Sequence, residues 1–255
     1  MPDDLLQLDE EPETVLSVHW LRRGLATVYV SGSASRFDAA IVQAIDEPEE
    51  PMAFGEDSEA MSRLLDEVPG WTCINVPPGC AEALGTILER DGRCPVRHYG
   101  DVYHVLRGPL APGTVSHPHA RLLDEEDLAL LEAAPPEVRG AGYESTAALL
   151  REGIVAGVVL DDALVAIAHT VARIERYAEL GVFTLNRFRR RGLATAAAFL
   201  VAERVLAEGQ TPVWSAGEGN RASLRVAQKL GFVETSRRIY LIPDRGGSSV
   251  PPQDA

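Results

Sequence analysis

The sequence predicts an α/β (α+β) fold in which a mixed central sheet is flanked by helices. Short runs of β-branched and aromatic residues alternate with segments of helical periodicity along most of the 255 residues. Hydrophobic residues make up 45% of the chain, which is enough to fill a substantial core. The stretch 109–119 has the composition of a linker, so we expect a domain boundary there.

The first half, residues 1–108, is predicted to begin with an acidic N-terminal tail. Its elements are then expected in the order β-β-α-β-α-β. In the segment 58–68, for example, Met61, Leu64 and Val68 fall on one side of a helix. The expected elements are a connecting helix at 17–26, strands at 27–30 and 39–45, a helix at 58–68, a strand at 71–76, a helix at 81–90 and a strand at 99–106. We favour the interpretation that the first half is a scaffold that pairs with the second half. The alternative is that it forms a lid or recognises the substrate.

The second half, residues 120–243, is predicted to be more regular. Its expected elements are a strand at 120–123, helices at 124–132 and 143–150, strands at 154–160, 163–171 and 177–185, a helix at 193–206, a strand at 212–215, a helix after Asn220 and a strand at 236–242. The turn Asp161-Asp162 joins two of these strands as a hairpin. Residues 244–255 are rich in glycine, serine and proline and are expected to form a disordered tail.

A basic turn, Arg189-Arg190-Arg191-Gly192, connects the strand at 177–185 to the helix at 193–206. The start of a helix leaves backbone N–H groups unpaired and carries the positive end of the helix dipole, so it suits a phosphate or pyrophosphate. The alternative is an ordinary turn with a solvated basic face. The turn has neither a Walker lysine-serine pair nor further glycines at dinucleotide spacing, which excludes a P-loop and a Rossmann fingerprint.

Two motifs carry a resemblance to a known family. Arg189-x-x-Gly192-x-Ala194 resembles the [Gln/Arg]-x-x-Gly-x-[Gly/Ala] motif of the GCN5-related N-acetyltransferases (GNAT), whose loop amides hold the coenzyme A pyrophosphate. Downstream, Asn220-x-x-Ser223 leads through a helix to Lys229-Leu230-Gly231-Phe232, which resembles the second signature of that family. The motifs lie within residues 120–243, whereas the first half resembles the family only as a degenerate GNAT-like copy without the pyrophosphate motif.

The resemblance implies an acetyl-CoA-dependent N-acetyltransferase, which transfers an acetyl group to an amine of a small molecule or a peptide by direct attack, without an acyl-enzyme. Acetyl-CoA is the implied co-substrate, held by loop amides and basic side chains and paired with the edge of the preceding strand. The residues that the resemblance assigns to this binding are Phe183, Thr184, Leu185, Arg189, Arg190, Arg191, Gly192, Leu193, Ala194, Thr195, Asn220 and Ser223.

Glu179, near the start of the strand before the basic turn, resembles in its placement the base glutamate of histone-type members of the family. A carboxyl near an apolar cleft can have a pKa close to neutrality and act as a general base. The alternative is a solvent-facing glutamate at a strand edge.

The general acid is not assigned by the resemblance, because Ala227 stands where many members carry a tyrosine. Ser223, Tyr240, Tyr143 or water could replace it. A non-catalytic acyl-CoA-binding or regulatory module is therefore an alternative function. A transferase that uses a longer acyl-CoA is another, since Ala194 and Ala227 are small enough to widen the groove.

The formal net charge of −14 argues against a nucleic-acid-binding protein and favours an amine or cationic substrate. The three cysteines are odd in number, lack the paired spacing of a zinc site and are expected to be reduced, and we expect no metal. The sequence shows neither a signal segment nor an apolar run long enough to span a bilayer, which predicts a cytoplasmic protein without a membrane partner. A homodimer is left open.

Overall fold

The structure is a computed structural model that describes residues 6–92, 94–110 and 115–244. Their strands form one mixed, eleven-stranded sheet in the order β1-β2-β3-β4-β11-β5-β10-β9-β8-β7-β6. The strands are β1 (Ala26–Ser33), β2 (Arg36–Ala44), β3 (Met52–Gly55), β4 (Ile74–Val76), β5 (Val96–Val105), β6 (Ala120–Leu123), β7 (Val155–Leu160), β8 (Ala163–Arg173), β9 (Tyr177–Thr184), β10 (Thr211–Gly217) and β11 (Val233–Pro243). The predicted fold class is confirmed. The predicted C-terminal tail beyond Asp244, the start of the N-terminal tail and part of the predicted linker lie outside the described residues.

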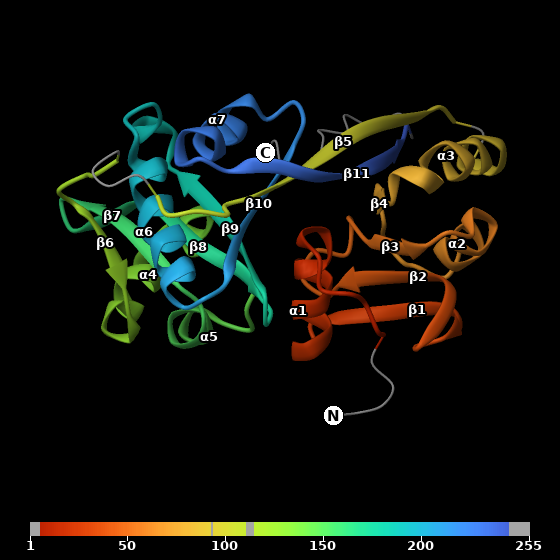
Figure 1. Ribbon diagram of the computed structural model, residues 1–255, viewed down its shortest axis with the longest axis horizontal. Coiled ribbons are helices and arrows are strands. Elements are labelled where there is room, and N and C mark those ends of the chain that lie inside the picture. Colours follow the sequence, from red (N-terminus) through yellow and green to blue (C-terminus); the bar gives the residue numbers. More distant parts are fainter. Residues whose placement is uncertain (1–5, 93, 111–114, 245–255) are drawn as a thin grey trace.

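Helices flank this sheet (Figure 1). The α-helices are α1 (Val15–Arg23), α2 (Ser58–Leu65), α3 (Pro78–Gly92), α4 (Leu128–Ala133), α5 (Thr146–Glu152), α6 (Leu193–Ala207) and α7 (Arg221–Leu230). Short 3-10 turns are present at Pro12–Thr14, Glu125–Asp127, Pro136–Val138 and Asn186–Phe188. In the part of the chain that the structure describes, none of the helices has both the length and the apolar character needed to cross a membrane.

Most predicted elements are present, with shifted ends. Strand β3 was not predicted, because four residues are too few for a periodic pattern to be read. Helix α5 begins at Thr146, three residues later than expected, because the Ser145 side chain accepts a hydrogen bond from the backbone N–H of Ala148 and caps it there. The turn Asp161-Asp162 has φ values of 49° and 60°, as in the tight hairpin turn that joins β7 and β8.

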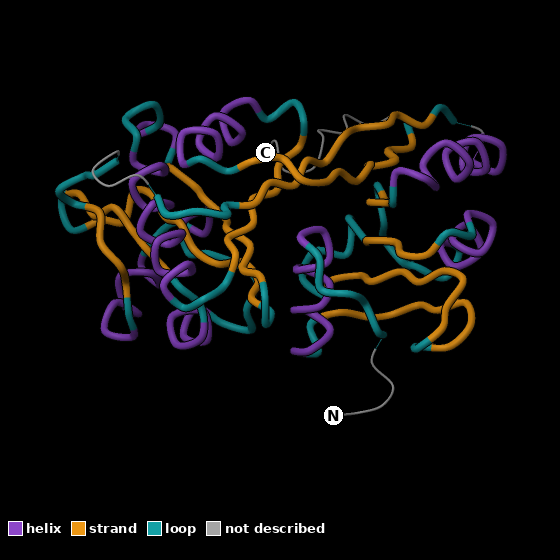
Figure 2. Tube along the Cα trace, viewed as in Figure 1, coloured by secondary structure: helices purple, strands orange, loops and turns teal. Residues whose placement is uncertain are grey.

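The two halves of the chain exchange strands. β5, from the first half, lies between β10 and β11, and β11 in turn lies between β5 and β4. The β5–β11 ladder runs antiparallel from Val96 paired with Pro243 to Val105 paired with Val233. In Figure 1 these two strands run side by side from one group of elements to the other, and Figure 2 shows the same continuity along the trace. The sheet therefore crosses the sequence boundary at the linker without a break.

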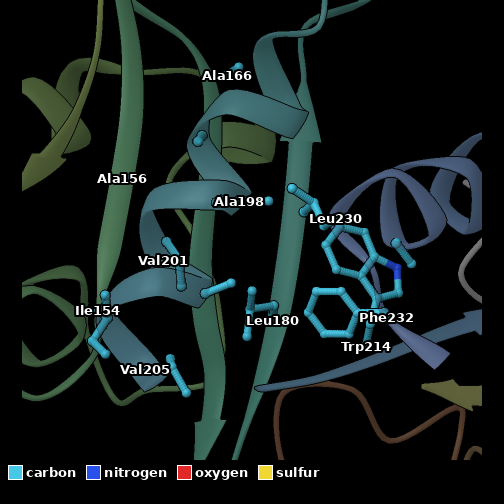
Figure 3. Packing of buried hydrophobic residues seen from close by; sticks show 14 of the residues in the cluster. Ile154, Ala156, Ala166, Leu180, Ala198, Val201, Val205, Trp214, Leu230 and Phe232 are labelled. Carbon is cyan, nitrogen blue, oxygen red and sulfur yellow. The ribbon is translucent and has the colours of Figure 1, made fainter. Parts of the chain in front are cut away.

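Helix α6 is the centre of the largest apolar core. Its residues Ala198, Val201 and Val205 are fully buried on the sheet, against residues such as Ile154 and Leu180 (Figure 3). The rings of Trp214 and Phe232 belong to the same cluster and meet edge to face, with centroids 5.6 Å apart. The core therefore fixes the start of α6 relative to β9 and β10.

β9 and β10 separate shortly after they begin to pair. They pair in parallel only from Tyr177 to Glu179 and from Thr211 to Val213. Beyond that point β10 pairs with β5 as far as Gly217, while β9 continues along β8 to Thr184. The sheet thus opens directly after Glu179, on the side toward the N-terminus of α6.

Candidate functional site

A cavity of about 1070 Å³ lies where β9 and β10 separate. Its wall contains residues of β9, β10, α6 and α7, of the loop 139–143, and of the first half of the chain. One continuous space therefore joins the start of α6 to Glu179 and to elements that precede the predicted linker.

The start of α6 forms one end of this cavity. Gly192 caps the helix with a φ of 77°, and Arg190 also has a positive φ of 65°. The first helical hydrogen bond runs from the Ala196 N–H to the Gly192 carbonyl over 3.0 Å. The backbone N–H groups of Leu193, Ala194 and Thr195 precede this bond and are not used by the helix, so they suit an anion.

Basic side chains surround that helix start. The Nε of Arg189 donates to the Thr184 carbonyl over 3.2 Å, and its guanidinium lies 5.6 Å from the centre of the Phe183 ring. Arg190, Arg225 and Lys229 also line the cavity. We call this part of the wall the basic end; its charge and the helix dipole both favour a phosphate-bearing ligand.

Asn220 and Ser223 hold α7 and Trp214 in place beside the cavity. The Asn220 side chain caps α7 by accepting a hydrogen bond of 3.0 Å from the Ser223 N–H. The Ser223 hydroxyl accepts a hydrogen bond of 2.9 Å from the indole N–H of Trp214. Both residues line the cavity, so the second sequence motif contributes to the wall at the same time as it fixes the helix.

The structure brings most of the predicted site residues into one wall. Leu185 and Arg191 are the exceptions, since neither lines the cavity. Leu185 packs in a neighbouring core cluster and donates its N–H to Val165, and the Arg191 guanidinium lies 5.5 Å from the centre of the Phe188 ring. The residues that line it are Glu179, Phe183, Thr184, Arg189, Arg190, Gly192, Leu193, Ala194, Thr195, Asn220 and Ser223.

Glu179 is buried in the cavity wall, with only 2% of its surface exposed. The Ser215 hydroxyl donates a hydrogen bond to its Oε1, whereas Oε2 accepts none from the described residues. The pKa of Glu179 is raised to about 8: burial is the main cause, the hydrogen bond from Ser215 opposes it, and the charge of Asp101 adds a smaller increase. The carboxyl therefore has a free oxygen and a pKa near neutrality, both of which suit proton transfer.

A second buried carboxyl lies two strands away on the same face of the sheet. The β5–β10 register sets Tyr103 opposite Ser215 and Asp101 opposite Gly217. Asp101 accepts a hydrogen bond of 2.9 Å from Asn75, and a further one from Tyr103. Burial raises the pKa of Asp101 to about 6. Its charge reaches Glu179 through the low-dielectric core.

The candidates for a general acid differ in position. Tyr143 and Ser223 line the cavity, and the Tyr143 hydroxyl lies 3.4 Å from that of Thr170. Tyr240 is buried in β11 and is not part of the cavity wall. Ala227 has no exposed surface and belongs to the core cluster around α6.

Several residues of the cavity wall were not predicted from the sequence. Arg225 and Lys229 are four residues apart and share a face of α7, a spacing that could have indicated them. Ser215 could not be found in this way, because it is 36 residues from Glu179 along the chain. The wall residues of the first half, among them Trp20, Asp46 and Glu47, carry no local motif.

Replacing Ser215 by alanine should move the pH dependence of any reaction in which Glu179 accepts a proton. The hydroxyl stabilises the carboxylate, so its loss raises the pKa of Glu179. We expect the acidic limb of the kcat/KM profile to shift upward by about one pH unit, with the rate at high pH retained. Ser215→Thr, which keeps the hydroxyl, should restore the profile; an alanine variant with an unshifted limb would contradict this role.

Among the described residues, no group of three or more His, Cys, Asp and Glu side chains is placed to hold a metal ion.

Part of the chain is similar to a known protein family. A family model described as GNAT acetyltransferase matches residues 136–240. No curated protein matches the sequence.

Solved structures with a similar fold cover both halves of the chain. A GCN5-related N-acetyltransferase-like protein from Streptococcus suis 89/1591 has a TM-score of 0.68 at 20% identity and covers 91% of this chain and 93% of its own. A GCN5-related N-acetyltransferase from Kribbella flavida has a TM-score of 0.58 at 17% identity, with coverages of 91% and 94%. A tandem GNAT protein from the clavulanic acid biosynthesis pathway has a TM-score of 0.54 at 16% identity, with coverages of 92% and 89%. At these identities the likeness shows the fold.

Proposed function

Through residues 136–240 this chain belongs to the GNAT superfamily, as its motifs predicted, and on that premise we propose that it is an acetyl-CoA-dependent N-acetyltransferase acting on an amine. One observation carries the proposal. A single cavity joins an unpaired helix start with basic side chains to a buried carboxyl that has a free oxygen. The first feature suits a pyrophosphate and the second suits an amine proton.

The residues at the basic end fit coenzyme A. The amides of Leu193 to Thr195 would hold the pyrophosphate, with Arg189 and Arg190 adding charge, and Phe183 and Thr184 of β9 border the path toward Glu179. If Gly192 carried a Cβ atom, no described atom would lie within 4 Å of it. This space leaves room for the phosphates. The bound co-substrate would supply the acetyl group as a thioester.

Glu179 takes the proton in the proposed reaction. The amine nitrogen forms a bond to the acetyl carbon, its proton passes to the free Oε2 directly or through water, and the carbon–sulfur bond breaks. The leaving thiolate takes a proton from Tyr143, Ser223 or water. Glu179 must be ionised to act, and with a pKa of about 8 roughly a tenth of the molecules are in that form at pH 7.

Calorimetric titration with acetyl-CoA tests the donor site. Gly192→Glu should weaken binding by about tenfold or more, because it places a carboxylate beside the pyrophosphate and strains a residue with a φ of 77°. Gly209→Glu is the matched control: Gly209 follows the other end of α6, has a φ of 81°, has no described atom near its Cβ position and does not line the cavity.

Equal affinity in the wild type and in both variants would exclude this helix start as the donor site. The loss of binding in both variants would point to damage to α6 as a whole and would equally remove support for the site. Loss in Gly192→Glu alone is the expected result.

A non-catalytic acyl-CoA-binding module is the second candidate function. It is favoured by the position of Ala227, which is fully buried in the core and offers no acidic hydroxyl. Amine-dependent release of free CoA thiol distinguishes the two functions, since a binding module releases none. We further expect the protein in a reducing compartment such as the cytoplasm, because Cys73, Cys80 and Cys94 are all unpaired.

A further inference from the structure

The first half of the chain contributes the wall of the cavity that faces Glu179 from helix α1. Leu16 and Trp20 of α1 line the cavity, and α1 packs against β9. The Leu25 N–H donates to the Trp20 carbonyl over 2.8 Å, and the Ile45 N–H donates to the Leu25 carbonyl over 2.9 Å. This chain of contacts leads from β9 across α1 to the end of β2, where Asp46 and Glu47 also line the cavity.

His19 fixes this wall to the second half. It is 3% exposed, and its ring nitrogens contact the backbone of Arg173 and, over 2.8 Å, the carbonyl of Gly142. The ring meets Tyr143 edge to face at 5.0 Å. Trp20, on the same helix, is therefore held in a set position relative to the loop 139–143 and to Tyr143, which lines the same cavity.

The chemistry of this wall changes along its length. Leu16, Trp20 and Leu25 give it an apolar and aromatic section, and Asp46 and Glu47 follow. Neither carboxylate forms an ion pair with the described residues. Burial, then the charges of Asp46 and Glu49, raise the pKa of Glu47, so these carboxylates repel one another. A bound cation would relieve that repulsion.

The two ends of the cavity carry opposite charge. The basic end holds Arg189, Arg190, Arg225 and Lys229, whereas the section beyond Glu179 holds Asp46 and Glu47. Arg139 also lines the cavity, and its Nε is bonded to the Ala134 carbonyl over 2.7 Å. A cationic ligand is thus repelled from the donor end and attracted to the carboxylates, which orients it before any contact with the acetyl group.

We propose that the acceptor is an aliphatic amine with a second cationic group, bound with its reactive nitrogen at Glu179, its apolar chain along Leu16 and Trp20, and its second charge at Asp46 and Glu47. The face of Trp20 can add a cation–π contribution. This proposal rests on the proposed function for the chemistry of the reactive nitrogen, but the binding of a dication to this wall can be measured without turnover.

The experiment compares a homologous series of linear α,ω-diamines with monoamines of the same chain length. For each acceptor, kcat and KM are measured at saturating acetyl-CoA, and binding to the CoA-loaded protein is measured by calorimetry. We expect at least one diamine to have a KM about tenfold lower than its monoamine. The double variant Asp46→Asn/Glu47→Gln should remove that difference by raising the KM of the diamine to that of its monoamine.

Glu67→Gln is the matched control, since Glu67 is an exposed carboxylate of the first half that neither lines the cavity nor acts on Glu47. Equal KM values for diamines and monoamines, or a preference that survives in the double variant, would overturn the proposal while the transferase function stands. If no acceptor is turned over, diamine-selective binding that the double variant loses would support the acceptor site and count against the chemistry. Unselective binding would refute the site.

Discussion

Glu179→Gln is expected to lower kcat by about 10²–10⁴-fold without changing the affinity for acetyl-CoA, because it removes the proton acceptor and keeps the shape of the side chain. The amide oxygen can still accept the hydrogen bond from Ser215. The basic end of the cavity consists of other residues, so the donor site should be untouched. Steady-state kinetics with one amine acceptor and calorimetry with acetyl-CoA measure the two effects separately.

The pH profile distinguishes a base from a residue that only shapes the cavity. Burial raises the pKa of Glu179 to about 8, so the wild-type kcat/KM should rise with pH through that value. Ionisation of the amine acceptor affects the wild type and Glu179→Gln alike. Only the wild type should therefore show an additional limb in its kcat/KM profile, from the ionisation of Glu179. Glu175→Gln is the control, since Glu175 is exposed just before β9 and does not line the cavity. An unaltered rate in Glu179→Gln would remove this residue from the mechanism.

The same substitution should alter stability with a defined sign. The folded state holds the Glu179 proton more tightly than the unfolded state, because the pKa is raised from 4.5 to about 8. The free energy of unfolding of the wild type therefore falls as the pH rises through this window, and glutamine removes that decrease. Melting temperatures measured between pH 4.5 and pH 8 should show that Glu179→Gln becomes more stable relative to the wild type as the pH rises. Parallel curves for the two proteins would mean that the carboxyl titrates normally.

Local signals were sufficient for most of the second half of the fold and for the helix start at the basic end of the cavity. The run from Val182 to Thr195 contains a strand, a turn and a helix start in sequence order, so its geometry follows from periodicity and from Gly192. Asn220 and Ser223 were identified from the resemblance of their motif to the second signature of the family, and in the structure the Asn220 side chain also caps α7.

The remainder depends on contacts between distant segments. The exchange of β5 and β11 has no local signal, because each strand could pair with any neighbour that buries the same face. The contribution of the first half to the cavity could likewise not be predicted from the sequence. Trp20 and Asp46 become cavity residues only when α1 packs on β9. The choice between a scaffold and a lid or substrate-recognition half therefore stays a prediction, to which the cavity residues of the first half add the proposal made above.

Arg238→Ala is expected to destabilise the protein by about 3–5 kcal/mol, because it removes the cation from a buried polar network at the strand exchange. Arg238 lies on β11, is 3% exposed, and donates hydrogen bonds to the Asn75 side chain and, over 2.5 Å, to the Ala53 carbonyl. Asn75 in turn donates to Asp101 on β5. The network thus joins strands of both halves, and among the described residues Arg238 is the cation whose charge acts on the buried Asp101.

Arg237→Ala provides the matched comparison for this effect. Arg237 is the preceding residue of β11, is exposed, and pairs with Glu234 on the surface at 2.6 Å, so its loss should change the free energy of unfolding by less than about 1 kcal/mol. Denaturant unfolding of both variants measures the difference. Similar losses in the two variants would show that the buried network contributes little.

The pH dependence of the Arg238→Ala defect separates lost charge compensation from lost packing. Burial already raises the pKa of Asp101 from 3.8 to about 6, and removal of the cation must raise it further. A raised carboxyl pKa lowers stability as the pH rises above the unfolded value. The defect should therefore be full above the folded pKa and reduced near pH 4, where Asp101 is protonated in the folded state of both the wild type and the variant. The guanidinium carbon of Arg238 lies 4.8 Å from the centre of the Phe54 ring, so this side chain also contributes packing. A defect of constant size across this pH range would indicate that the packing matters more than the charge.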